Sequence, residues 1–122
     1  MISGSINRLS YLCQIIPGLL LNIPEEEFSK KPLPGKWSRK EILGHLLDSA
    51  TNNHQRFVRS QFEDTPSISY AQNNWVDCSN YNQLNSRLLI AFWQTYNQFI
   101  SELMRHISPE NLKRECNSGG EK

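Results

Sequence analysis

The chain has 122 residues, which we expect to form one domain over 1–122 and which exclude a two-domain enzyme. Its 38% hydrophobic and 10% aromatic residues are enough to form a core and exclude a disordered chain. The net charge of +1 provides no global field for phosphates, so we expect no nucleic-acid partner.

The cysteines and the apolar segments indicate a cytoplasmic protein that does not enter a membrane. Cys13, Cys78 and Cys116 are odd in number and far apart, so we expect reduced thiols rather than a disulfide framework or a zinc clamp. The apolar run at residues 15–21 is too short to cross a bilayer, and no basic start or cleavage site marks it as a targeting signal.

A first helix is predicted over residues 2–20, where apolar side chains recur at steps of three and four. These side chains are Ile2, Ile6, Leu9, Cys13, Ile16 and Leu20. Pro17 removes one backbone hydrogen bond and clashes with the preceding turn, so we expect a kink or an early end near it. Pro24 and the three glutamates that follow predict a short helical turn, because acidic side chains stabilise a helix N-terminus.

The strongest local signal marks the start of a second helix at Arg39. Ser38 and Glu41 have the spacing of a capping box, in which each side chain accepts a hydrogen bond from the other residue's backbone N–H. Trp37 and Ile42 occupy the positions of a hydrophobic staple around this cap. We predict that the helix runs over residues 39–62. Its predicted apolar face consists of Ile42, Leu43, Leu46, Leu47, Ala50 and Phe57.

Residues 63–79 show no helical period, and a loop of this length in a small domain is more often functional than idle. Asn80 and Gln83 give a weaker capping signal, which predicts a third long helix over residues 81–107 with a wide apolar and aromatic face. Residues 108–110 predict the first turn of a further short helix. Residues 117–120 have the composition of a flexible connector, which we expect to lead to a further segment.

Three long helices with wide apolar faces predict an all-α, up-down bundle. The aromatic content of the third helix exceeds what two partner helices would cover, so we expect a fourth helix to be missing. Either a longer chain supplies that helix or a second copy covers the open seam. A complete three-helix bundle stays open as the alternative.

The three histidines do not form a metal site by spacing alone. His45 and His54 are nine positions apart on one predicted helix, so they point to opposite sides of it. In an antiparallel hairpin His106 would lie roughly 8 Å along the axis from His45, which is a poor match for a shared ligand. His45 has Asp48 and Ser49 one turn later, so it is either a metal ligand with a nearby carboxylate or a half-buried structural histidine. Taken alone, the sequence favours the structural role.

A resemblance to a known family changes that balance. The segment Pro34-Gly-Lys-Trp-Ser-Arg-Lys-Glu-Ile-Leu-Gly-His-Leu-Leu-Asp-Ser-Ala50, followed by Asn53 and Arg56-Phe57, resembles the DinB superfamily, which includes the YfiT-like proteins. The segments 16–20, 24–28, 70–75 and the helix from Tyr81 support the resemblance over nearly the whole chain.

The resemblance implies an up-down-down-up four-helix bundle, of which this chain holds only the first three long helices. It also implies that the protein forms a dimer, as members of the family commonly do. Three histidines are expected to bind a divalent metal, often zinc or nickel. The first ligand corresponds to His45. The other two come as a His-x-x-x-His pair on a fourth helix, and this sequence contains no such pair.

Two functions therefore compete. The first is a DinB-like, divalent-metal-dependent hydrolase or thiol transferase of unknown substrate. In it His45 binds the metal, Asp48 supports His45, and Tyr70 and Trp75 line the pocket for a small-molecule substrate. The second is a non-enzymatic helical interaction module or homodimer, in which His45 is structural and an apolar seam binds a partner helix or a second copy.

Overall fold

The structure is a computed structural model that describes residues 2–118, and over that range the fold is helical. Three long helices, α1 (Ile2–Leu21), α3 (Arg39–Arg59) and α5 (Ser86–Arg105), are joined by the short helices α2 (Glu25–Phe28) and α4 (Gln72–Ser79). No β-strand occurs among these residues, and a single isolated bridge pairs Ser67 with Asn117. None of the helices in this range has the length and apolar character needed to cross a lipid bilayer.

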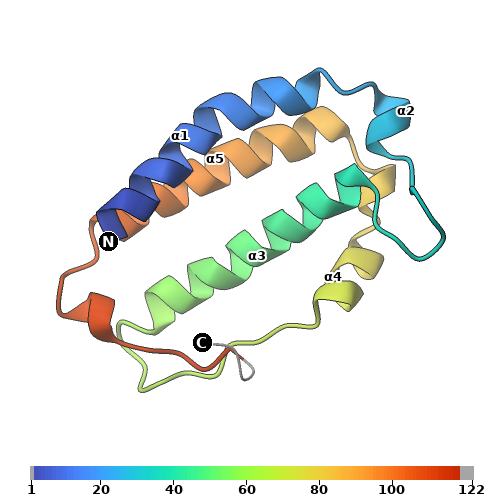
Figure 1. The fold of residues 1–122 in the computed structure, drawn as a ribbon. Coiled ribbons are helices and arrows are strands. Elements are labelled where there is room, and N and C mark those ends of the chain that lie inside the picture. The colour runs from blue at the N-terminus through green and yellow to red at the C-terminus, as the bar shows by residue number, and fades with distance from the viewer. Residues whose placement is uncertain (1, 119–122) are drawn as a thin grey trace.

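Helix α5 is the element on which the other two long helices pack. Both α1 and α3 lie along α5, and they hardly contact each other. Figure 1 shows that α3 and α5 run in the same direction, whereas α1 runs opposite to both. The simple up-down order expected from the apolar periodicity is therefore wrong, and the order of these three helices is the one that the family resemblance implies.

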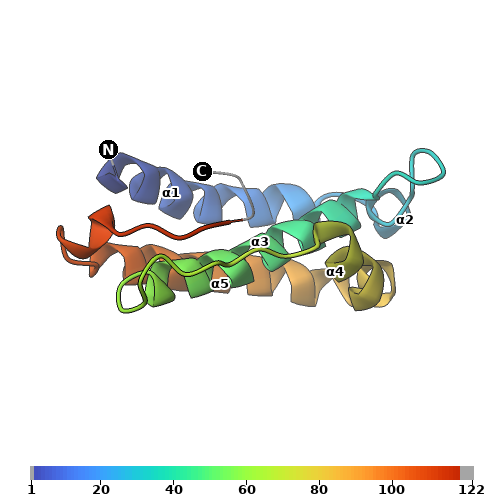
Figure 2. The same ribbon diagram turned by 90° about the horizontal axis from the view of Figure 1, so that it is seen from below.

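Because α3 and α5 are parallel, the chain between them must return along the length of α3. Helix α3 has 21 residues and is therefore about 30 Å long. Residues 60–71, which lie between the end of α3 and the start of α4, can span at most about 40 Å when extended. This segment, here called the crossover, consequently runs with little slack beside α3, as Figures 1 and 2 show.

The structure corrects the expected loop and the expected start of the third helix. Residues 72–79, which we predicted to belong to a loop over 63–79, form α4. An eight-residue helix is too short to show a clear period, and packing against α3 stabilises it instead. Asn80 ends α4 in a left-handed conformation (φ 54°), and α5 begins only after Asn85, whose side chain accepts the Leu88 N–H.

The other local predictions have mixed outcomes. The turn after Pro24 forms α2, and a short 3-10 turn at Asn111–Lys113 follows Ser108. Helix α1 continues through Pro17 to Leu21, so the expected early end does not occur. The predicted connector over 117–120 lies partly outside the described residues, and its first residue, Asn117, pairs with the crossover through the Ile68 N–H and the Pro66 carbonyl.

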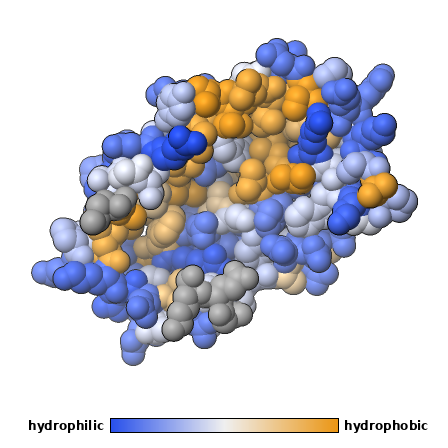
Figure 3. Space-filling view, viewed as in Figure 1, coloured by the Kyte–Doolittle hydropathy of each residue, from blue (hydrophilic) through white to orange (hydrophobic). Residues whose placement is uncertain are grey.

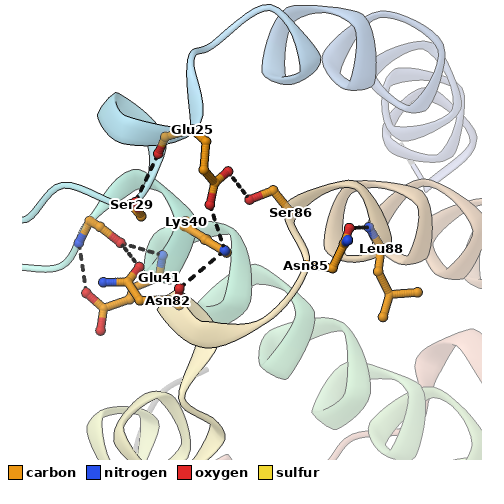
Figure 4. Close-up of polar contacts among 9 residues, drawn as sticks. Glu25, Ser29, Lys40, Glu41, Asn82, Asn85, Ser86 and Leu88 are labelled. Atoms are coloured by element: carbon orange, nitrogen blue, oxygen red, sulfur yellow. Dashed lines mark hydrogen bonds and ion pairs between the residues drawn. The ribbon is translucent and has the colours of Figure 1, made fainter.

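A polar network at one end of the bundle holds the start of α3 (Figure 4). The predicted capping box is present: the Glu41 N–H donates to Ser38 Oγ at 3.0 Å, and the Ser38 N–H donates to Glu41 Oε1 at 2.9 Å. Lys40 is only 2% exposed, and its ammonium donates to Glu25 Oε1 at 3.0 Å and to the Asn82 carbonyl at 3.4 Å. These contacts connect α2, α3 and the chain before α5.

The core does not cover all of the apolar side chains. Its buried members are Cys13, Phe28, Leu43, Leu47, Val76, Tyr81, Leu89, Ile90 and Trp93. Large apolar side chains stay exposed on α1, where Leu19 is 60% exposed, and on α3, where Ile42 and Leu46 belong to the predicted apolar face. Figure 3 shows a broad apolar area over α1. The long helices therefore leave apolar surface that an additional element could cover.

Gly44 provides a test of the packing between α3 and the chain before α5. A Cβ at this position would lie 2.1 Å from Cδ2 of Tyr81, which is far inside van der Waals contact. We predict that Gly44→Ala lowers the free energy of unfolding by about 1–3 kcal/mol through overpacking. Denaturant unfolding followed by circular dichroism measures this change.

The matched control is Gly18→Ala, since Gly18 also lies in a long helix but a Cβ there meets nothing within 4 Å. This variant is expected to stabilise the protein by up to about 1 kcal/mol, because alanine is the better helix former. Equal effects of the two substitutions would contradict the close approach of Tyr81 to α3.

Candidate functional site

One polar face of α3 lines an open cavity opposite the crossover. His45, Ser49, Asn53 and Arg56 follow each other at steps of four, four and three, so they share one face of the helix. The rest of the lining consists of residues 69–74 and Ser118, and the cavity has a volume of about 750 Å³. That volume falls in the range of small-molecule sites.

Two side chains of α3, Ser49 and Arg56, bind the crossover and hold this wall of the cavity in place. Ser49 Oγ and the Tyr70 hydroxyl share a hydrogen bond of 2.7 Å. The Arg56 guanidinium donates to the Ile68 carbonyl from Nε at 3.2 Å and from Nη2 at 2.9 Å, and it donates to Asn53 Oδ1 from Nη1 at 3.0 Å. The cavity is thus built by the face of α3 that carries His45.

The His45 ring lies half-buried in the wall of the cavity. Its ring centroid is 5.1 Å from that of Trp37, with an angle of 34° between the planes. His45 Nδ1 is buried and has no hydrogen-bond partner among the described residues. A buried polar atom without a partner is costly, so this nitrogen is a candidate to bind a ligand that the described residues do not supply.

Asp48 lies one turn after His45 and is only 3% exposed. Its Oδ1 accepts a hydrogen bond from the Tyr81 hydroxyl, whereas its Oδ2 has no partner among the described residues. Burial raises the pKa of the Asp48 carboxyl above its ordinary value, although the Tyr81 hydrogen bond and the nearby His45 act in the opposite direction. Burial together with Asp48 also raises the pKa of Tyr81 to about 12. A hydrogen bond between Asp48 and His45 is not formed, and the supporting role of Asp48 stays a prediction.

The other candidate residues differ in their positions relative to the cavity. Tyr70 lines the cavity, and Trp75 packs against Tyr70 in an edge-to-face geometry at 5.5 Å, behind the lining. His54 faces α5, where its Nδ1 lies 2.8 Å from the Tyr96 hydroxyl. His106 is mostly exposed at the far end of α5, about 20 Å along the helices from His45 because α3 and α5 run in parallel. The antiparallel placement of His106 considered from the sequence is therefore wrong, and the two histidines do not form a pair.

Sequence reasoning missed three residues of this region. The sequence patterns give Trp37 only a position in the hydrophobic staple and Tyr81 only a place at the start of a helix, so neither pattern indicates a contact with His45 or Asp48. Arg56 was noted as part of a motif without a role, although its spacing of eleven residues from His45 already places the two on one helix face. No sequence signal could have paired Tyr81 with Asp48, because the two residues are 33 positions apart.

The described residues do not by themselves form a metal site. No three His, Cys, Asp or Glu side chains among residues 2–118 come together as a group that could hold a metal ion. A catalytic zinc site normally takes three protein ligands, and only His45 is a candidate here.

Comparisons with known proteins give the following likenesses. The model of the DinB superfamily matches residues 12–122. A relative in Oceanobacillus iheyensis, named "Putative metal-dependent hydrolase OB0782", is 23% identical over 110 residues, which cover 89% of this chain and 63% of that protein. "Putative metal-dependent hydrolase YfiT" of Bacillus subtilis is 27% identical over 81 residues, which cover 66% of this chain and 46% of that protein. The chain spans less than two thirds of the length of these curated relatives.

A solved structure has the same fold. YfiT from Bacillus subtilis, described as "a probable metal-dependent hydrolase with an unusual four-helix bundle topology", aligns with a TM-score of 0.74 at 21% identity. The alignment covers 89% of this chain and 65% of that one. The helices of this chain are therefore arranged like part of that four-helix bundle.

The buried Asp48 carboxyl predicts a pH dependence of stability. Because its pKa is raised on folding, the folded chain holds this proton more tightly than the unfolded chain, so stability falls as pH rises from about 4 through the raised pKa. We predict that Asp48→Asn removes this part of the dependence and raises the melting temperature at pH 7. Thermal unfolding between pH 4 and pH 8 measures both effects.

The exposed Asp77 of α4 is the matched control, and Asp77→Asn should leave the pH profile unchanged. A profile of Asp48→Asn that keeps the slope of the original protein would show that Asp48 is not the group responsible.

Proposed function

The chain belongs to the DinB superfamily, and on that premise we propose that it carries the His45-bearing part of a divalent-metal-dependent hydrolase or thiol transferase. Zinc and nickel are the metals we propose. The names of both curated relatives refer to metal-dependent hydrolases. The observation that supports the proposal most directly is that His45 lines a cavity of small-molecule size, while its buried Nδ1 has no partner in the described part of the chain.

We further propose that a fourth helix completes the bundle and brings the donors that residues 2–118 lack. Two observations support this arrangement. The matched solved structure is a four-helix bundle of which this chain covers 65%, and α1 and α3 pack on α5 while leaving apolar side chains exposed. A helix that covers those side chains would convert three packed helices into a bundle of four.

Within this function the chain's own residues have distinct roles. His45 is the proposed metal ligand, and Trp37 restrains its ring by packing against it. Asp48, held by Tyr81, is the proposed supporting carboxylate. Tyr70 lines the cavity and Trp75 supports Tyr70 from behind, and the cavity takes a small-molecule substrate.

A second function is favoured by the exposed apolar side chains on α1 and α3. In that case the chain is an interaction module that binds a second copy of itself, and His45 is structural. Exposed apolar patches of this kind commonly mark protein–protein contacts.

The first function predicts that metal binding depends on His45. Protein expressed from its complete reading frame and purified without chelator should contain about one zinc or nickel ion per chain, measured by elemental analysis. His45→Ala should lose that metal. His54→Ala is the control, because His54 faces α5 and should leave the metal content unchanged. Equal metal content in all three proteins would contradict the proposal.

The second function predicts self-association of the 122-residue chain through its apolar surface. Sedimentation at increasing concentration should show a dimer, and Leu46→Glu should weaken it by about tenfold, since an acidic side chain would be buried at the contact. Gln55→Glu, at an exposed position of the same helix, is the control. A chain that stays monomeric at every concentration would rule out the dimer.

A further inference from the structure

We infer that the cavity beside His45 binds an elongated polar ligand with a terminal carboxylate or phosphate, and that Arg56 binds this anionic end. The inference rests on the proposed function, because it concerns the ligand of the same cavity. It names a ligand class and an anchoring residue that the family likeness does not.

The charge of the cavity lining is the first argument. Among residues 2–118, no acidic side chain lines the cavity, and Arg56 is the only lining residue with a permanent charge. The remaining side chains of the lining are hydroxyls, amides, the His45 imidazole and the methyl group of Ala71. A cavity with one guanidinium and no carboxylate favours an anionic ligand over a cationic one.

The hydrogen bonds of Arg56 are the second argument. A guanidinium has five N–H groups, and Arg56 uses three of them on the Ile68 carbonyl and on Asn53. The other two have no partner among the described residues, and Arg56 forms no ion pair there. Arg59, one turn later, differs because its guanidinium binds both carboxylate oxygens of Glu63. Arg56 is therefore held in place and keeps donors for a carboxylate or phosphate.

The third argument concerns the shape of the ligand. Arg56 and His45 are eleven residues apart on α3, which corresponds to about 16 Å along the helix axis. Ser49 and Asn53 lie between them, and the amides of Gln72, Asn73 and Asn74 face them from the other wall. A ligand that reaches from Arg56 to His45 is consequently elongated and forms hydrogen bonds along its length.

Binding of two small anions and one neutral analogue tests the inference. The 122-residue chain, in buffer with a metal chelator, is titrated with malonate, with inorganic phosphate and with neutral malonamide, and amide resonances are followed by NMR. We expect malonate or phosphate to shift the signals of residues 69–74 and of the Arg56 side chain in a saturable way, while malonamide does not. The better of the two anions identifies the carboxylate or the phosphate class.

Three variants test whether Arg56 binds the anion. Arg56→Gln should weaken binding by about tenfold or more, as expected for loss of a charged hydrogen-bond donor. Arg59→Gln, which removes an equal charge outside the lining, should change it by less than about twofold. Because Arg56→Gln also removes bonds to the crossover, Arg56→Lys is included, which keeps the charge and should bind with intermediate affinity.

Three results would overturn the inference: no saturable shift with either anion, equal binding of malonamide, or equal loss in the Arg56→Gln and Arg59→Gln proteins. The comparison of malonate with malonamide needs no variant, so a folding defect cannot obscure it. Because the titration contains no metal, it is independent of the metal analysis of His45. Metal retention without anion binding would remove only this inference, and anion binding without metal would remove only the proposed metal dependence.

Discussion

The parallel direction of α3 and α5 is the constraint on which the rest of the structure depends. A chain that ends one helix and starts a parallel neighbour must first return over the length of the first helix, about 30 Å here. The crossover makes this return with little slack, so it lies against α3 and hydrogen-bonds to it through Ser49 and Arg56. The polar cavity is a direct result of that path.

The interactions that stabilise α3 also position His45. The capping box and the buried Lys40 hold the first turn, and His45 lies about one turn further along. Gly44 admits the ring of Tyr81, whose hydroxyl binds Asp48. Burying Asp48 with one unpartnered oxygen reduces stability, which is typical of a residue retained for a function rather than for folding.

The same element could complete both the fold and the site. Residues 2–118 leave apolar side chains exposed on α1 and α3 and offer one imidazole where a metal needs several donors. A helix in the position that completes the four-helix bundle would cover the apolar side chains and could carry further donors. Because one helix would complete both the fold and the site, we favour the metal-dependent function over the interaction module.

Features that depend on neighbours within a few residues were predictable without any knowledge of the fold. The capping box at Ser38, the apolar periods of the three long helices and the opposite orientations of His45 and His54 all follow from hydrogen bonds and spacing within one helix. Packing between distant segments was needed to establish that α3 and α5 are parallel, that residues 72–79 form α4, and which residues surround His45. Trp37, Asp48 and Tyr81 come together through packing between segments far apart in the chain, and a local pattern carries no information about such contacts.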